Sequence, residues 1–183
     1  MRRVLLLLGI LMAWSAAAVT NAQSNVVVSR RVYLPVIMKT PPAPPSTPTP
    51  LPLSFEDRVL VIVNQHRANA GCSPLYTSVQ LTTAAENHSS DMAANNYFSH
   101  TGSDGSSPAL RAQVAGYPFG AAENIAAGQA TPEEVVAAWM DSQGHRTNIL
   151  NCSYKTTGVG YLFDANDTFG PYYHYWTQMF GLQ

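Results

Sequence analysis

The sequence predicts an α+β fold for residues 54–183, with helices packed on an antiparallel sheet. Three segments repeat apolar residues every three to four positions and begin at residues that cap helices. The last quarter of the chain instead alternates its side chains with a period of two, which is typical of strands. The chain contains no internal repeat, and its length of 183 residues allows one domain of ordinary size.

The first predicted helix begins after Ser54. Asp57 follows three residues later, which is the spacing of a capping box. Val59 and Val63 then fall on one face at helical spacing, and Gly71 is the expected stop. We therefore expect a helix of about four turns between Ser54 and Gly71.

The second predicted helix begins after Ser78, which is a favourable N-cap residue. Its apolar stripe steps by three and four residues and ends before Asn95 and Asn96. The stripe consists of Leu81, Ala84, Ala85, His88 and Met92.

The third predicted helix has three concordant start signals. Thr131 is the cap, Pro132 occupies the first helical position and Glu134 the third. The apolar pattern continues to about Ser142, and Gly144 is the expected end of the helix.

The last quarter predicts an antiparallel hairpin. Residues 158–163 and 172–180 alternate their side chains and are rich in β-branched and aromatic residues. The connection at 164–170 contains Asn, Asp and Gly, which are residue types that form turns. We therefore expect two paired strands against which the helices pack.

Charge is divided unevenly along a chain that is nearly neutral. The sequence has 10 basic and 11 acidic residues, a formal net charge of −1. All acidic residues and half of the basic ones lie after residue 53, so residues 1–53 carry +5 and residues 54–183 carry −6. An acidic domain argues against nucleic acid as a partner, because the phosphate backbone requires a basic surface.

Residues 1–22 have the pattern of a cleaved secretory signal peptide. Two arginines precede a continuous apolar run over residues 4–19, and small residues follow. This run is shorter than the roughly 20 apolar residues that span a bilayer. We therefore expect an extracellular or cell-surface protein with no transmembrane anchor once the signal is removed.

Residues 23–53 are expected to form a spacer before the domain at 54–183. Residues 40–53 are a proline-rich linker, which favours an extended polyproline II conformation. Residues 23–39 contain two short apolar stretches, and either an edge strand on the domain or a sorting or assembly tag would explain them.

Cys72 and Cys152 are the only cysteines, and an even pair in an exported chain predicts a disulfide. Two buried thiols are the alternative. The bridge would enclose 79 residues and stabilise the fold by at most about 4–5 kcal/mol. It would also fix the exit of the first helix to the start of the sheet.

The five histidines divide into two groups. Three of them have structural explanations. His66 ends the first helix as a solvated or capping residue, His88 lies on an apolar stripe, and His174 alternates with aromatic residues in a strand. His100 and His145 each lie just beyond a predicted helix among Gly, Ser and Asn, where loops present side chains to a cleft.

His100, His145 and Glu123 are the candidate ligands of a divalent cation. Imidazole is the commonest metal ligand, and two histidines with one carboxylate could hold Zn²⁺ while leaving positions for water. Glu123 is chosen because no basic residue lies within four positions of it. The common zinc-protease, redox, hydrolase and nucleotide-binding motifs are absent.

Six sequence blocks run in a fixed order through residues 56–183. They are NQHRANAG, NYFSHTGSDG, AENIAAG, AAWMDSQGHRTNILN, TGVGY and YWTQMFG. In content and order these blocks resemble the CAP superfamily, which comprises the cysteine-rich secretory, antigen 5 and pathogenesis-related-1 (SCP-like) proteins. The similarity is greatest to the short bacterial extracellular members.

The resemblance implies an α-β-α sandwich, in which helices lie on both sides of a small antiparallel sheet beside a large central cleft. It also implies that His100, His145 and Glu123 line this cleft, where several members of the family bind zinc or another divalent cation.

One position departs from the pattern of the family. Many eukaryotic members have a second cleft glutamate three positions after the helix tryptophan. Counting from Trp139 gives Ser142 here, with Asp141 one residue before it. The resemblance therefore implies two histidines and one carboxylate, and it weakens any mechanism that needs two glutamates.

The leading expectation is a secreted, non-enzymatic module that binds a cation and a peptide, lipid or envelope glycan. A metal-dependent hydrolase of peptides or cell-wall material is the alternative, with Glu123 as general base. Glu123 could equally orient one of the histidines, and a binding module then explains the same residues with fewer assumptions. A structural envelope protein with a vestigial cleft is the third interpretation.

Overall fold

The computed structural model describes residues 52–170 and 172–183, so the predicted signal peptide and almost all of the predicted spacer lie outside the described residues. The described residues form five helices and a four-stranded sheet. The helices are α1 (Phe55–Asn69), α2 (Val79–Ala94), α3 (Pro108–Val114), α4 (Pro132–Asp141) and α5 (Gln143–Ile149). The strands are β1 (Tyr76–Thr77), β2 (Ala121–Ala127), β3 (Thr156–Phe163) and β4 (His174–Gly181).

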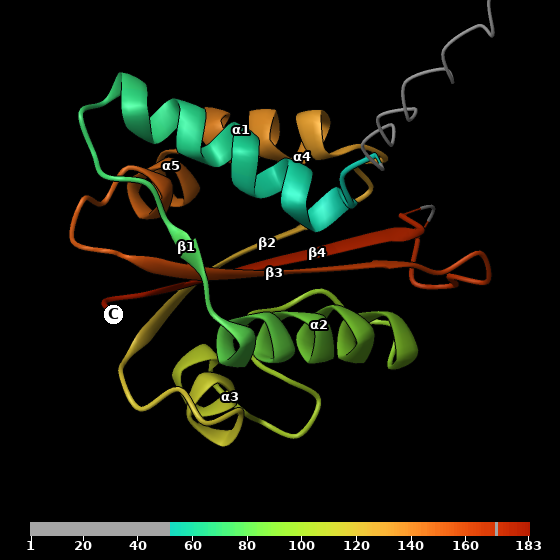
Figure 1. Cartoon of the computed structure of the whole chain (residues 1–183). Coiled ribbons are helices and arrows are strands. Elements are labelled where there is room, and N and C mark those ends of the chain that lie inside the picture. The colour runs from blue at the N-terminus through green and yellow to red at the C-terminus, as the bar shows by residue number, and fades with distance from the viewer. Residues whose placement is uncertain (1–51, 171) are drawn as a thin grey trace, which may run out of the picture. The chain divides into compact units, whose positions relative to one another are not determined.

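The sheet separates two layers of helices (Figure 1). Helices α1, α4 and α5 cover one face, and α2 and α3 cover the other. The strand order is β1-β3-β4-β2, and β3, β4 and β2 pair antiparallel. The α-β-α sandwich and the C-terminal hairpin are therefore confirmed. The two-residue β1 adds a parallel pair at the edge, which the sequence pattern did not predict.

The three predicted helices begin at the predicted residues. Ser54, Ser78 and Thr131 each accept a hydrogen bond from the backbone N–H three residues later, which satisfies one of the free donors of the first turn. Gly71 follows α1 with a φ of 77°, a left-handed conformation that glycine adopts without a steric cost.

The third helix ends at Ser142 as predicted, but Gly144 is not what stops it. Ser142 both ends α4 and caps α5, so Gly144 lies inside a second helix instead of stopping the first. Helix α5 shows little apolar periodicity because Ile149 is its only buried residue. Helix α3 and strand β2 were also missed, because each is only seven residues long and β2 consists mostly of alanine.

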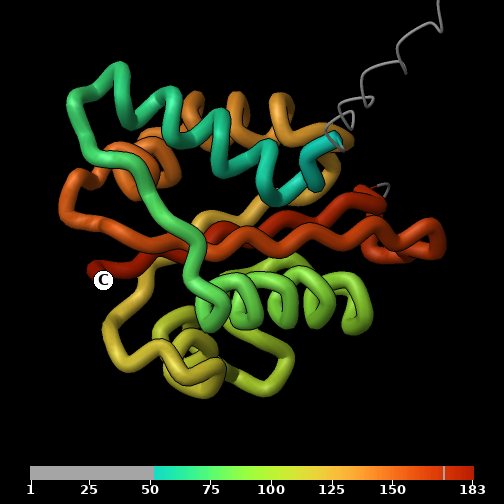
Figure 2. Tube along the Cα trace, viewed as in Figure 1, coloured from blue at the N-terminus to red at the C-terminus, as the bar shows by residue number. Residues whose placement is uncertain are grey.

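Two glycines allow α2 to lie directly on the sheet, as the traces of α2 and β3 show (Figure 2). A Cβ atom on Gly158 would lie 2.0 Å from the backbone nitrogen of Thr82. One on Gly160 would lie 2.3 Å from the carbonyl carbon of Ala85. The backbones of α2 and β3 are therefore in contact at these two glycines.

Strand β4 is buried on both faces. Trp176 and Phe180 pack into the core beneath α1 and α4, whereas Tyr175 and Met179 pack with residues of α2. The predicted alternation thus distributes the side chains between two cores instead of between a core and solvent.

The predicted disulfide is confirmed, with the Cα atoms of Cys72 and Cys152 4.9 Å apart. It joins the exit of α1 to the segment that leads into β3. Arg67 strengthens the same junction from a fully buried position. Its guanidinium donates to four backbone carbonyls, at 2.7–3.0 Å. The acceptors are the carbonyls of Ser73, Ile149, Asn151 and Tyr154.

Candidate functional site

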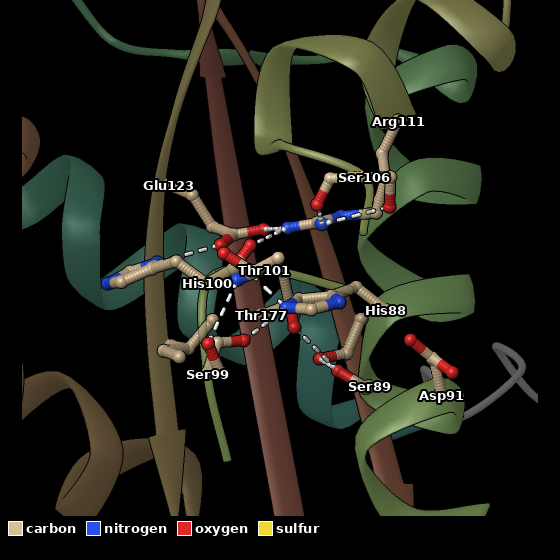
Figure 3. A network of polar contacts seen from close by, with 12 residues as sticks. His88, Ser89, Asp91, Ser99, His100, Thr101, Ser106, Arg111, Glu123 and Thr177 are labelled. Atoms are coloured by element: carbon tan, nitrogen blue, oxygen red, sulfur yellow. Dashed lines mark hydrogen bonds and ion pairs between the residues drawn. The ribbon is translucent and has the colours of Figure 1, made fainter. Parts of the chain in front are cut away.

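Glu123 lies at the centre of a polar network beside the sheet (Figure 3). Strand β2 carries it, and its side chain is only 1% exposed. Oε1 lies 2.8 Å from His100 Nδ1, and Oε2 accepts a hydrogen bond from Arg111 Nη2 at 2.6 Å. Both carboxylate oxygens are therefore engaged, and the charge of Glu123 is neutralised where water has little access.

Arg111 is a central residue that sequence reasoning missed. It extends from α3 and also donates to the backbone carbonyls of Ser106 and His100, at 2.8 and 2.9 Å. The guanidinium thus ties the loop that carries His100 to the strand that carries Glu123. Arg111 is the only basic residue between Arg67 and Arg146, and this isolation is the one signal that could have identified it.

A second cluster holds the same loop at its base. Asp91 of α2 accepts hydrogen bonds from the Ser103 backbone at 2.9 Å, from Asn95 Nδ2 at 2.7 Å and from the Tyr97 hydroxyl. Burial alone would raise the pKa of Asp91, but the hydrogen bonds from Ser103, Tyr97 and Asn95 outweigh it and lower the pKa to about 2. Asp91 therefore stays ionised and anchors the turn that positions His100.

The orientation of His100 follows from its contact with Glu123. A carboxylate can only accept, so His100 Nδ1 carries the hydrogen of this bond. In the neutral ring the lone pair then resides on Nε2, and the side chain is 53% exposed. His100 is therefore held at a fixed tautomer, with one ring nitrogen directed toward solvent-accessible space.

His145 lies on α5 and not in a loop, because the chain restarts a helix at Gln143. Helix α5 is tied to β2 by hydrogen bonds from Asn124 Nδ2 to the His145 carbonyl and from Asn148 Nδ2 to the Glu123 carbonyl, at 3.1 and 3.2 Å. Burial lowers the pKa of His145, and the charge of His100 lowers it further. The two histidines are thus close enough to interact, and His145 favours the neutral form.

His145 opens onto a cleft of about 360 Å³ between β2, α4 and α5, here called the β2–α5 cleft. Ser142 also lines this cleft, whereas the neighbouring Asp141 is exposed and does not. The Gln129 side-chain oxygen in its wall is buried without a hydrogen-bond partner. The remaining lining residues are largely apolar or aromatic: Phe98, Ile125, Ala126, Ala127, Ala138, Trp139 and Tyr172.

The other histidines lie as their patterns indicate. His88 is fully buried, and its Nε2 lies 3.0 Å from the Ser99 carbonyl, so it is a hydrogen-bonded core residue as predicted. Its Nε2 is also 3.8 Å from Glu123 Oε1, and burial lowers its pKa. His66 lies near the end of α1, and His174 contacts the Tyr161 hydroxyl at 2.9 Å.

The geometry does not fit Glu123 as a third metal ligand. Within residues 52–170 and 172–183, no group of three or more His, Cys, Asp and Glu side chains is placed to hold a metal ion. Arg111 and His100 already take up both oxygens of Glu123. His100 Nε2 and the ring of His145 are the groups that could contribute to a cation site.

Among the described residues, no helix is long and apolar enough to cross a membrane.

The family model of the cysteine-rich secretory proteins (CAP) matches residues 60–180. The chain is 40% identical over 128 residues to the uncharacterized protein YkwD of Bacillus subtilis (strain 168), which covers 69% of this chain and 47% of that protein.

Two solved structures extend the comparison. An extracellular protein containing an SCP domain from Bacillus anthracis str. Ames has a TM-score of 0.62 and 28% identity, covering 73% of this chain and 45% of that one. An outer surface protein from Borrelia burgdorferi has a TM-score of 0.62 at 18% identity, covering 72% of this chain and 96% of that one, which shows a shared fold alone. The chain spans about half the length of the two Bacillus proteins.

Proposed function

Because this chain belongs to the cysteine-rich secretory protein (CAP) family, we propose that it is an extracellular ligand-binding module and not an enzyme. The engagement of both Glu123 oxygens by His100 and Arg111 carries this proposal. A general base has to reach the water from which it takes a proton. The side chain of Glu123 is only 1% exposed and is paired with Arg111, so we assign it the role of orienting His100.

The binding site comprises His100 and the β2–α5 cleft. His100 Nε2 and the side-chain oxygen of Gln129 are acceptors, and Ser142 and His145 add further polar groups. These groups favour a ligand that carries hydroxyl or amide groups, which is a property of peptides and envelope glycans. A lipid acyl chain would leave the same groups unpaired, at a cost in affinity.

Residues 1–53 account for the proposed extracellular location. The signal peptide at residues 1–22 would export the chain, and residues 23–53 would act as a spacer between the acidic domain and the surface or larger assembly to which it is attached. Extracellular ligands such as cell-wall fragments would then be accessible to the cleft.

A divalent-cation site formed by His100 and His145, without Glu123, stays a prediction. Calorimetric titration with zinc of the wild type, His100→Ala and His145→Ala tests it. Binding that is lost in both variants supports a two-histidine site. Equal binding in all three proteins, or none, contradicts it.

The ligand proposal is tested by NMR titration of the purified protein with cell-wall oligosaccharides and stem peptides. We expect saturable shifts in residues of the β2–α5 cleft, weakened about tenfold in His100→Ala and in His145→Ala. His174→Ala is the matched control, because His174 lies in β4 and does not line the cleft. Wild-type affinity in both cleft variants would contradict the proposal.

The second candidate function, a hydrolase, is favoured by one observation. A histidine whose Nδ1 donates to a buried carboxylate is the arrangement that positions a general base. His100 Nε2, and not Glu123, would then take the proton from water. Turnover of peptide or peptidoglycan substrates that disappears in both His100→Ala and Glu123→Gln, with the fold retained, would overturn the non-enzymatic proposal.

A further inference from the structure

Strand β2 is an edge strand of the sheet. Among the described residues it pairs with β4 alone, at the end of the order β1-β3-β4-β2. An edge strand presents backbone N–H and C=O groups that can pair with a further strand. The register of the sheet identifies these groups on β2.

The backbone groups of Glu123, Ile125 and Ala127 point away from β4. In an antiparallel pair, alternate residues bond to the neighbouring strand, and the residues between them point to the other side. The N–H of Gly128 donates to the carbonyl of His174, its partner in the same register, at 2.9 Å. The even-numbered residues of β2 therefore bond to β4, and the odd-numbered residues form the outer edge.

Two side chains already cover part of this edge. Asn148 Nδ2 donates to the Glu123 carbonyl and Trp139 Nε1 donates to the Ile125 carbonyl, each at 3.2 Å. Ala127 differs, because within residues 52–170 and 172–183 neither its N–H nor its C=O has a hydrogen-bond partner. The open part of the edge is therefore the Ala127 end of β2.

The β2–α5 cleft gives access to this end. Ala127 lines the cleft and is partly exposed. The cleft is bounded from both layers of the sandwich, so it follows the edge of the sheet and not one of its faces. One wall is Phe98, which follows α2 and is 41% exposed, and the opposite wall consists of Ala138, Ser142 and His145 of the α4–α5 region.

We propose that the β2–α5 cleft binds an extended peptide as an added strand at the Ala127 end of β2. This inference rests on the proposed function, because it names the ligand class of the same cleft. The peptide residue opposite Ala127 accepts a hydrogen bond from its N–H and donates one to its C=O. Every peptide residue except proline carries this donor and acceptor, whereas a glycan does not carry them at strand spacing.

The walls of the cleft specify the side chains of the peptide. The side chain of Ala127 packs with the cluster that contains Met92 of α2, so the peptide residue opposite Ala127 would point to the same side, toward Phe98. An apolar side chain fits there. The two neighbouring peptide residues would point the other way, toward Ser142 and His145, where hydroxyl groups fit. Basic ends complement the charge of −6 on residues 54–183.

The peptide acetyl-Lys-Thr-Val-Thr-Lys-amide is the probe for NMR titration of the purified protein. We expect saturable shifts at Ala127, and hydrogen exchange of its amide slowed at least about tenfold in the complex. The amide of Ala126 is the internal control, because it already bonds to β4. An Ala127 amide that exchanges slowly in the free protein would show that another part of the chain covers the edge, and would overturn the proposal.

Two methylated forms of the probe test the pairing without altering the protein. N-methylation of the central valine removes the N–H that donates to Ala127, and we expect binding to weaken at least about tenfold. N-methylation of the threonine that follows it removes an N–H that points away from β2, so the affinity should change less than about threefold. Equal effects of the two methyl groups would refute strand pairing.

A pair of variants on α4 locates the site. Ala138→Trp narrows the cleft, and we expect it to weaken binding of the probe at least about tenfold. Ala137→Trp is the matched control, because Ala137 is exposed and does not line the cleft. Unchanged affinity in Ala138→Trp would refute the location, and the methylated probes still test the pairing if this variant fails to fold.

Failure of this inference is distinguishable from failure of the proposed function. If cell-wall oligosaccharides shift the cleft residues saturably and the pentapeptide does not, strand addition is wrong and the binding module stands. If neither ligand binds, both proposals are wrong.

Discussion

Replacing Gly160 with alanine tests how α2 is held on the sheet. The added Cβ would lie 2.3 Å from both the carbonyl carbon of Ala85 and the backbone nitrogen of Glu86, and 2.5 Å from the Ala85 oxygen. Carbon atoms in favourable contact are about 3.5–4.0 Å apart, so α2 and β3 would have to separate by about 1 Å or more.

The expected loss in the free energy of unfolding depends on which groups have to move. Overpacking typically costs about 1–3 kcal/mol when side chains can rearrange. Here the obstacle at Gly160 is the backbone of a 16-residue helix, which cannot rotate away. Moving α2 also loosens the packing of its buried residues, among them Leu81 and Met92. We therefore expect Gly160→Ala to lower the free energy of unfolding by about 3 kcal/mol or more.

Urea unfolding of the wild type, Gly160→Ala and Gly144→Ala provides the measurement. Gly144 is the matched control, because it lies in α5 and a Cβ there would meet nothing within 4 Å. Its replacement by alanine should leave stability unchanged or raise it by up to about 1 kcal/mol through helix propensity. If Gly160→Ala also stays within about 1 kcal/mol of the wild type, the close packing of α2 on β3 is refuted.

Three further predictions concern stability. Arg67→Met should lower the free energy of unfolding by about 4 kcal/mol, because it removes charge-assisted hydrogen bonds to four carbonyls; a loss below about 1 kcal/mol in urea unfolding would contradict this. Reducing the bond between Cys72 and Cys152 should cost up to about 4 kcal/mol, and non-reducing mass spectrometry should find the two residues linked. The free energy of unfolding should fall in two stages as the pH is lowered. The first stage begins below about pH 6.5, because burial lowers the pKa of His88 and the unfolded chain therefore binds this proton more readily. The second stage runs from about pH 3.8 toward 2, because the pKa of Asp91 is lowered to about 2 in the folded protein. Asp91→Asn should remove the second stage, worth about 1 kcal/mol after solvent screening, and an unchanged acid profile would refute it.

Local sequence patterns predicted the elements whose stability depends on near neighbours. The caps at Ser54, Ser78 and Thr131 bond to backbone groups three residues away, so their signals are visible in the sequence. Strand β2 and helix α5 were not predicted because their local signals are weak. Strand β2 consists mostly of alanine and so shows little alternation, and α5 has no separate start signal because Ser142, which caps it, also ends α4.

The candidate site was likewise only partly predictable from the sequence. His100, Glu123 and His145 were identified from residue type and local context, and the contact between His100 and Glu123 confirms that the first two lie together. In the structure the two oxygens of Glu123 contact His100 and Arg111. The contact between Glu123 and Arg111 corresponds to no recognisable spacing pattern in the sequence.

By itself the sequence determined the fold class, the three capped helices, the C-terminal hairpin, the pairing of Cys72 with Cys152 and the family. These depend on local hydrogen bonds, on periodicity or on a choice between few partners. Only the tertiary structure decided that Glu123 contacts His100 and Arg111 and that His88 Nδ1 is buried without a hydrogen-bond partner. The physical reason is that the state of a buried charge or acceptor depends on which distant groups reach it, and those groups come from separate elements that only folding brings together.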